Sequence, residues 1–280
     1  MLRSVDLCDY MQKNPIKIGE KDSINEAVSL ILEHRVSGLC VVDGANNLLG
    51  VLSEIDCLRV GLSAIHEKAS KKEISSYMQP YPVKIFPEDD LFVAANSIIE
   101  NRVSGLCVVT RQQQLIGVLS EMDCLRVILS AIYNDHREVG KVEEHMTEAV
   151  ESCDVNANLI YVAEDMLKKG RRRRPIVNKG RLIGQITCRQ ILKQLYYTSH
   201  NVGFVKSHMN MNVESCDLHS DIVGVSNDMV KKGRRRRPVL ENGRLVGQIT
   251  CRQLLRVISE FNRNQVAANF DPIYRDLPQK

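Results

Sequence analysis

The stretch VSGLCVVDGANNLLGVLSEIDCLRV at 36–60 returns at 103–127 as VSGLCVVTRQQQLIGVLSEMDCLRV. Further along, KKGRRRRPIVNKGRLIGQITCRQIL at 168–192 returns at 231–255 as KKGRRRRPVLENGRLVGQITCRQLL. A displacement of 68 residues then superposes the two kinds of repeat, since it places Cys107 on Pro175. Similarity at a fixed period indicates repeated structural units, so the chain of 280 residues is expected to contain four units of about sixty residues.

Within the first unit, the residues before the quoted stretch predict a strand and a helix. PIKI at 15–18 is a short apolar strand, and the segment from Ile24 has apolar residues at i, i+3, i+4 and i+7. Ser23 stands three residues before Glu26, the spacing of a capping box at the start of a helix.

The quoted stretch itself predicts a hairpin and a second helix. GLCVV at 38–42 and LLGVLS at 48–53 flank a turn of polar and small residues, as antiparallel strands do. A helix is expected from about residue 54. The fold class is therefore α+β (α/β-type), with the order β-α-β-β-α repeated four times.

This recurring pattern resembles the CBS domain, named after cystathionine beta-synthase. The resemblance rests on an apolar strand ending in C-V-V, P-I-V or P-V-L, a turn, a strand ending in Ser or Thr, and the helix that follows. It implies that the repeats pair into two pseudo-twofold tandem modules (Bateman modules). The expected repeats are 8–65 and 75–132 in a first module spanning 1–140, and 143–196 and 206–259 in a second module spanning 141–260, with a C-terminal tail at 261–280.

The resemblance also implies a function. CBS modules generally sense adenosine-containing ligands such as AMP, ADP, ATP or S-adenosylmethionine and lack catalytic machinery of their own. No recurring set of nucleophile, base and orienting group is found in this sequence, so no enzyme is expected. We expect a regulatory protein that signals to an unidentified regulated protein by favouring one arrangement of its units. The modules are expected to form a disc within one chain or through dimerisation, and a homodimer is expected.

The candidate ligand residues lie where the third strand of each unit runs into the second helix. In the first half this junction resembles the [ST]-x-x-D ribose-binding signature of the family, although a capping box explains the same spacing. In the second half Gln replaces Asp, which removes the charge and makes a ribose contact weaker. The ribose- and phosphate-binding candidates are Ser53, Asp56, Ser120 and Asp123, and their weaker equivalents are Thr187, Gln190, Thr250 and Gln253.

Charge divides the chain as well. Residues 1–140 carry 14 Lys and Arg against 19 Asp and Glu, whereas residues 141–280 carry 24 against 15. Such asymmetry indicates either a polyanionic partner for the basic half or attraction between the two halves.

The arginine runs lie at the start of the second strand in units three and four, in register with Val36 to Leu39 of unit one. Strand alternation places Arg171 and Arg173 on one face and Arg172 and Arg174 on the other, so one pair approaches the interior and requires anions. Our hypothesis is phosphate or polyanion binding, and the alternative is a salt-bridged edge that answers the acidic half. The candidates are Arg171, Arg172, Arg173, Arg174, Arg234, Arg235, Arg236 and Arg237.

Nucleic acid is a rival ligand for these runs. The chain has no Trp and 5% aromatic residues, and no aromatic residue interleaves the arginines to stack on bases. Nucleic-acid binding is therefore disfavoured. The alternative function is a charge-driven interaction scaffold, or a weak nucleic-acid-binding protein, with degenerate ligand pockets.

The remaining signals exclude other classes. None of the nine cysteines forms C-x-x-C, and eight of them occupy matched positions in different units. We interpret them as small buried groups rather than a metal cluster. Neither a secretory leader nor an apolar run long enough for a membrane helix is recognisable, so a cytoplasmic protein without membrane contact is expected.

Overall fold

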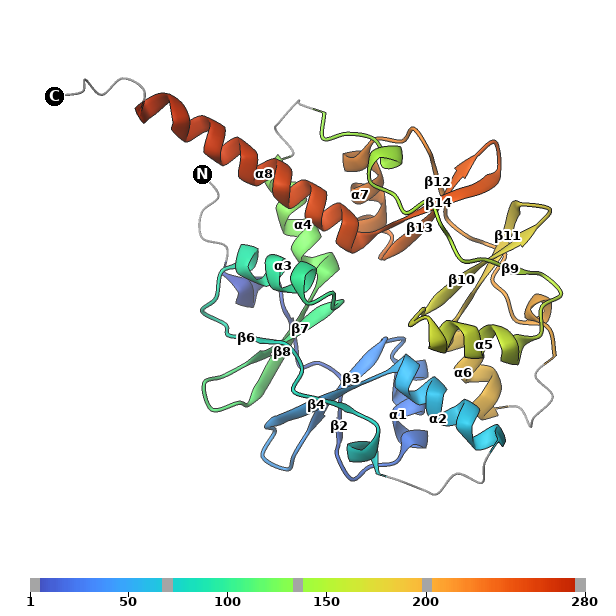
Figure 1. Cartoon of the computed structure of the whole chain (residues 1–280). Helices are drawn as coiled ribbons and strands as arrows, with labels where there is room; N and C mark the ends of the chain where they lie inside the picture. The colour runs from blue at the N-terminus through green and yellow to red at the C-terminus, as the bar shows by residue number, and fades with distance from the viewer. Residues whose placement is uncertain (1–5, 67–72, 133–137, 198–202, 275–280) are drawn as a thin grey trace.

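The computed structural model describes residues 6–66, 73–132, 138–197 and 203–274. The four repeats form four lobes around a common centre, as Figure 1 shows. Unit one lies beside unit two and beside unit three, while unit four lies beside units two and three. The units therefore form a disc within one chain.

Unit one has the predicted order of elements. Helix α1 (Ile24–Glu33) begins with the predicted capping box, because the Glu26 carboxylate accepts the backbone N–H of Ser23 at 2.9 Å. Strands β3 (Gly38–Val42) and β4 (Leu48–Ser53) have the predicted bounds and pair antiparallel. Asn46 allows the tight turn between them by adopting φ of 65°, a left-handed conformation that Asn tolerates. Helix α2 (Glu54–His66) completes the unit.

The same elements recur in the other three units. Unit two contains β6 (Lys84–Ile85), α3 (Leu91–Glu100), β7 (Gly105–Val109), β8 (Leu115–Ser120) and α4 (Glu121–Ile132). Unit three contains β9 (Cys153–Asp154), α5 (Leu159–Lys168), β10 (Arg173–Asn178), β11 (Arg181–Thr187) and α6 (Cys188–Tyr197). Unit four contains β12 (Cys216–Asp217), α7 (Ile222–Lys231), β13 (Arg236–Glu241), β14 (Arg244–Thr250) and α8 (Cys251–Tyr274).

Units one and two exchange short strands. Strand β1 (Gln12–Lys13) precedes β2 (Lys17–Gly19) in the chain but pairs with β8 of unit two. Strand β5 (Gln79–Pro80) in turn pairs with β4 of unit one. These two-residue strands had not been predicted from the sequence. They link units one and two by backbone hydrogen bonds.

Units three and four are joined at the equivalent places by the single bridges Thr147–Gln248 and Gln185–Asn210, and their hairpins pair as well. Their strands form one six-stranded sheet in the order β12-β13-β14-β11-β10-β9, in which Arg181 of β11 pairs with Arg244 of β14. The described strands therefore pair units one with two and units three with four, as the two-module hypothesis expects.

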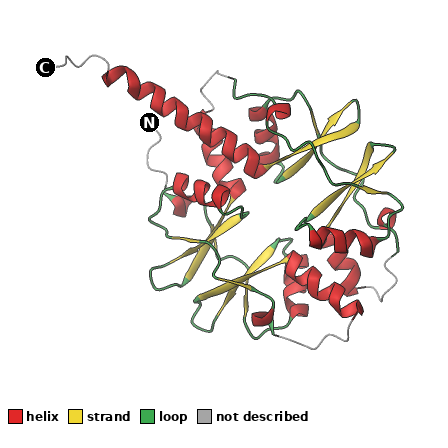
Figure 2. Ribbon diagram, in the orientation of Figure 1, coloured by secondary structure: helices red, strands yellow, loops and turns green. Residues whose placement is uncertain are grey.

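The helices join each unit to its other neighbour in the disc, unit one to unit three and unit two to unit four. Figure 2 shows two groups of helices alternating with two groups of strands around the disc. One large core is shared by units one and three and includes Ile31, Leu58, Met166 and Ile191. The other is shared by units two and four. A third, smaller apolar cluster lies between the hairpins of units one and two. Each large core therefore spans both predicted modules.

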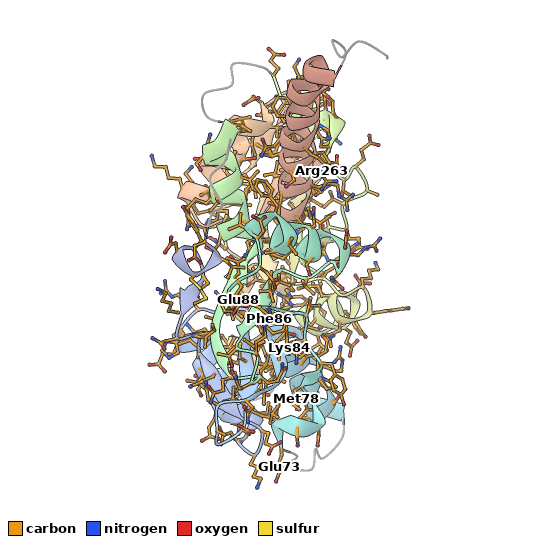
Figure 3. All side chains as sticks on the ribbon, turned by 90° about the vertical axis from the view of Figure 1, so that its left-hand side faces the viewer. Glu73, Met78, Lys84, Phe86, Glu88 and Arg263 are labelled. Atoms are coloured by element: carbon orange, nitrogen blue, oxygen red, sulfur yellow. The ribbon has the colours of Figure 1, made fainter. Side chains whose placement is uncertain are left out.

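The tail predicted from residue 261 does not begin there. Helix α8 continues to Tyr274, and Phe261 packs against the core of units two and four. Arg263, which Figure 3 labels on α8, donates a hydrogen bond to Asn96 of α3 at 3.1 Å. The end of the predicted tail, residues 275–280, lies outside the described residues.

Glycine is required where the exchanged strands cross. A Cβ at Gly50 would lie 2.8 Å from the carbonyl oxygen of Gln79, whereas a Cβ at Gly44 would meet nothing within 4 Å. We expect Gly50→Ala to lower the free energy of unfolding by about 1–3 kcal/mol, because the clash falls on backbone, and Gly44→Ala by less than about 0.5 kcal/mol. Urea unfolding measures both values, and hydrogen exchange at Gln79 reports whether β5 is released. Equal effects of the two substitutions would contradict this role for Gly50.

Candidate functional site

The junction residues of units one and two form capping boxes. The Asp56 carboxylate oxygen Oδ2 accepts the backbone N–H of Ser53 at 3.0 Å and the Ser53 hydroxyl at 2.6 Å. Ser120 and Asp123 repeat the same two bonds at the same distances. The capping box, which explains the spacing of these residues without a ligand, is therefore present at both junctions.

One oxygen of each aspartate is not used by the cap. Asp56 Oδ1 lies 3.1 Å from a guanidinium nitrogen of Arg59, whose side chain is 60% exposed. Asp123 Oδ1 has an equivalent contact with Arg126. Exposed ion pairs contribute little stability, so these oxygens can exchange their partner for a ligand hydroxyl at small cost.

The glutamines of the second half have a further structural partner. Gln190 Oε1 accepts the Thr187 hydroxyl at 2.8 Å, and its amide nitrogen donates to the carbonyl of His208 in unit four at 2.9 Å. Gln253 makes the same pair of contacts with Thr250 and with the carbonyl of His145 in unit three. A carboxylate cannot donate these bonds. The glutamines therefore link units three and four, which gives a physical reason to expect a weaker ribose contact there.

The arginine runs have the register that the sequence predicted. Arg173 pairs with Thr187 across β10 and β11, just as Gly38 pairs with Ser53 across β3 and β4. The predicted alternation of faces does not extend along the whole run, because β10 begins at Arg173. Arg171, which precedes the strand, lies 3.0 Å from the carboxylate of Glu151, and Arg174 approaches the same carboxylate at 3.8 Å.

Half of the candidate arginines are neutralised within their own units. The Arg174 side chain is 4% exposed and lies 2.5 Å from the carboxylate of Asp165 on α5. Arg237 pairs with Asp228 on α7 in the same way and also with Glu214, which Arg234 contacts too. Hydrogen bonds from Arg171 lower the pKa of Glu151 below its usual value. Arg171, Arg174, Arg234 and Arg237 thus form internal ion pairs, as in the salt-bridged alternative, and a ligand role for them stays a prediction.

The other four arginines converge at the centre of the disc. Arg235 of unit four donates a hydrogen bond to the Ser37 hydroxyl of unit one at 3.4 Å, although these units are not neighbours around the disc. Burial lowers the pKa of Arg173 and of Arg236. The positive charge of Arg235 lowers the pKa of Arg173 further, and that of Arg173 lowers the pKa of Arg236 further. The positive charge of Arg172 also acts to lower the pKa of Glu54 and of Arg236, so Arg172 belongs to the same group of charges.

Two buried glutamates face these arginines. Glu54 and Glu121 are the first residues of α2 and α4, and their exposed fractions are 6% and 7%. Burial raises the pKa of both carboxyls, and the surrounding arginines oppose that rise. Arg189 lies 3.8 Å from Glu54, and Arg252 acts on Glu121. The central cluster consists of Glu54, Glu121, Arg172, Arg173, Arg189, Arg235, Arg236 and Arg252.

The central cluster has an excess of positive charge. Six guanidiniums meet two carboxylates, and the buried Nε of Arg189 has no hydrogen-bond partner among the described residues. Burying charge without a counterion is costly. The arrangement therefore favours the binding of an anion with several oxygens.

Four members of the central cluster were missed by the sequence interpretation. Glu54, Glu121, Arg189 and Arg252 occupy the middle of the S/T-x-x-D/Q junctions, where only the outer residues had been assigned a role. The available signal was that these middle positions are Glu in the acidic half and Arg in the basic half.

The cysteines form no metal centre within the described ranges, where no group of three or more His, Cys, Asp or Glu residues could hold an ion. Cys40 and Cys107 are buried, as the interpretation of the cysteines as small buried groups expected, and these two matched positions meet. The sulfur atoms of Cys40 and Cys107 lie 3.8 Å apart.

The model of the CBS domain family matches this chain four times, at 7–63, 73–130, 139–197 and 205–260. The chain belongs to the CBS domain family. These matches account for the four lobes and leave the short segments between them.

Among known proteins, an uncharacterized protein of Methanocaldococcus jannaschii, MJ1225, is 25% identical over 237 residues, which cover 79% of this chain and 83% of that protein. The crystal structure of MJ1225 has a TM-score of 0.81 at 22% identity and covers 90% of this chain and 99% of that one, which shows that the folds agree. Inosine-5'-monophosphate dehydrogenase of Aquifex aeolicus is 26% identical over 200 residues, covering 69% of this chain and 37% of the enzyme. That match involves only the CBS portion of the enzyme, so catalysis is not carried over.

None of the helices in the described residues is both long and apolar enough to cross a membrane.

Substituting Asp165 and substituting its exposed partner Lys169 are expected to lower the stability of the protein by different amounts. Asp165 contacts the buried Arg174 and the exposed ammonium of Lys169, which lies 3.0 Å away. We expect Asp165→Ala to lower the free energy of unfolding by about 3 kcal/mol, since it leaves a buried guanidinium short of a counterion. Lys169→Ala removes the exposed partner and is expected to cost less than about 1 kcal/mol. Chemical denaturation of both variants measures the difference, and similar costs would show that Arg174 does not depend on Asp165.

Proposed function

We propose that this protein is a non-catalytic sensor of adenosine phosphates. The ribose binds at the Ser53–Asp56 and Ser120–Asp123 junctions, and the phosphates are held by the central cluster. The excess of guanidinium groups in the central cluster is the observation that carries this proposal. Guanidinium groups bind phosphate oxygens through paired, charge-assisted hydrogen bonds.

The proposed ribose and phosphate sites are contiguous. Glu54 directly follows Ser53 in the chain, and Glu121 directly follows Ser120. A ribose held at either aspartate therefore lies close to the central cluster, and we place its 5′ side toward the arginines. The N-terminal ends of the α2 and α4 dipoles also favour an anion there, although the backbone N–H groups of Glu54 and Glu121 already donate to Ser37 and Ser104.

The charge of the central cluster discriminates among adenosine ligands. AMP, ADP and ATP bring the anions that the arginines require, whereas the sulfonium of S-adenosylmethionine brings another positive charge. We therefore infer that the ligand is a nucleotide, and that its affinity rises with the number of phosphates.

Binding of an anion offers a route to a conformational signal. Burial lowers the pKa of Arg236 in unit four, and the positive charge of Arg173 in unit three lowers it further, since the two charges repel each other. A phosphate between them relieves this repulsion and favours a closer arrangement of the two units. A ligand shifts such an equilibrium only if it binds the two arrangements unequally, which a shared phosphate does.

The module boundaries at 1–140 and 141–260, a homodimer and a regulated protein that recognises the ligand-bound arrangement belong to the same proposal. A cytoplasmic setting is also proposed, because adenine nucleotides are available there. The charge-driven scaffold and the weak nucleic-acid-binding protein remain the alternatives if no nucleotide binds.

The ribose assignment predicts a loss of affinity on changing Asp56 or Asp123. We expect Asp56→Asn combined with Asp123→Asn to weaken AMP and ATP binding by about tenfold or more, since each lost charge-assisted hydrogen bond contributes about 1.5–3 kcal/mol. Isothermal calorimetry measures the affinity, and the shift of melting temperature with ligand checks it independently.

The matched control replaces the exposed carboxylates of Glu33 and Glu100, which occupy equivalent positions on α1 and α3. Glu33→Gln with Glu100→Gln removes the same charge from the same two units and should leave both affinities unchanged. Wild-type affinity in the aspartate double variant would leave those residues with their capping role alone.

The phosphate assignment predicts that affinity for ATP depends on the arginines but affinity for adenosine does not. Replacing Arg172, Arg173, Arg235 and Arg236 with Ala is expected to reduce ATP affinity at least a hundredfold, because each bond to a charged group contributes about 1.5–3 kcal/mol. Calorimetry with adenosine, AMP and ATP separates the ribose contribution from the phosphate contribution.

Arg181 and Arg244 provide the control, since both are exposed on the hairpins of units three and four. Arg181→Ala with Arg244→Ala should leave ATP affinity within about twofold, apart from long-range charge effects that salt screens. Equal losses in the two variants would indicate a diffuse charge effect and would overturn the central phosphate site. The absence of a thermal shift with any nucleotide would favour the scaffold.

A further inference from the structure

Cys40 and Cys107 meet at the contact between units one and two. They occupy equivalent positions in the third and seventh strands, 67 residues apart in the sequence. Their sulfur atoms are 3.8 Å apart, and each residue is 5% exposed. The two cysteines are neighbours because they lie close to the pseudo-twofold axis that relates unit one to unit two. A residue beside such an axis contacts the equivalent residue of the other unit.

The surroundings of the pair are apolar. The cluster that contains both cysteines also contains Val42 and Val109. Phe86, which Figure 3 shows between Lys84 and Glu88, packs at the edge of this cluster. The contact with Cys107 and burial raise the pKa of the Cys40 thiol far above its usual value. The same contact lowers the pKa of the Cys107 thiol, so Cys107 is the one that more readily forms a thiolate.

We propose that Cys40 and Cys107 are a site of oxidative cross-linking by a small peroxide. The thiolate of one cysteine attacks the peroxide, which breaks the O–O bond, forms a sulfenic acid and releases hydroxide, or water once this is protonated. The thiol of the other cysteine then displaces water from the sulfenic acid and forms the disulfide. In total two thiols are oxidised, and hydrogen peroxide is reduced to two molecules of water.

The geometry requires only a small approach of the two sulfur atoms. A disulfide has a bond of about 2.05 Å, so the separation must shorten by about 1.8 Å, shared between two side chains and two strands. The reaction needs a thiolate, which the contact with Cys40 favours at Cys107 and which burial opposes. The cross-link is therefore expected to form slowly at neutral pH and faster as the pH rises.

The cross-link is restricted to the contact between units one and two. Pro175 and Pro238 occupy the equivalent strand positions in units three and four, as their pairing with Gln185 and Gln248 shows. Cys40 lies two residues from Gly38, which pairs with Ser53, and Cys107 is related to Ser120 in the same way. A disulfide therefore fixes the relative placement of the two junctions. Only its effect on nucleotide binding rests on the function proposed above.

Treatment of the full chain with hydrogen peroxide tests the proposal. Residual thiols are alkylated, and the protein is digested without reductant by trypsin and a glutamate-specific protease. Cleavage after Glu54 separates the Cys40 peptide, 36–54, from Cys57, and trypsin releases Cys107 in 103–111. We expect a linked 36–54/103–111 species, lighter by two hydrogens than the sum of the peptides, whose yield rises with pH and falls after treatment with dithiothreitol.

Two kinds of variant make the result decisive. Cys40→Val and Cys107→Val keep an apolar side chain of similar size and should abolish the linked species, whereas Cys8→Ser should not change it. Oxidised wild-type protein should unfold at a higher urea concentration than reduced protein, and neither valine variant should show this shift. The proposal is overturned if the 36–54/103–111 species is absent, or appears only in denaturant, or forms no more readily than links among the other cysteines.

Discussion

The arrangement of the disc depends on the balance of charge at its centre. Guanidinium groups from units three and four converge on two buried carboxylates, Glu54 and Glu121, which units one and two supply from the first turns of α2 and α4. Charges of one sign repel strongly where water is excluded, so the basic units cannot occupy the centre alone. Arg189 reaches Glu54 and the carbonyl of Val36, and Arg235 reaches Ser37. The acidic half therefore helps to hold the basic half together, while positive charge remains for an anion.

Two kinds of contact hold the units around that centre. Helices build the large cores that join unit one to three and unit two to four, and strands join unit one to two and unit three to four. Packed helices bury far more apolar surface than exchanged strands of two residues, so the contacts within each predicted module are the easier ones to rearrange. The junction residues and the arginine runs border those same contacts. The ligand proposed for the centre would thus act where the fold resists movement least.

Much of this fold could be predicted from the sequence because local signals determined it. The hairpin bounds, the capping box at Ser23 and the register of the arginine runs depend on periodicity and spacing alone. Strands β1 and β5 could not be predicted, because two residues show no alternation and their partners lie in another unit. The division of the arginines also depends on acids distant in sequence, such as Asp165 and Glu151. The Cys40–Cys107 contact requires knowledge of the axis that relates two units.

The capping and ligand-binding interpretations of the junctions are compatible, because they use different atoms. In all four units the residue at the end of the motif directs one oxygen to the backbone N–H and hydroxyl of Ser or Thr, and this fixes the orientation of the side chain. The remaining atom then distinguishes the halves. In Asp56 it is a second carboxylate oxygen beside an exposed arginine, able to accept from a ribose. In Gln190 it is an amide nitrogen that donates to a neighbouring unit. The cap thus orients this side chain in every unit. Its remaining polar atom makes the Asp junctions candidate ligand sites and the Gln junctions structural links between units.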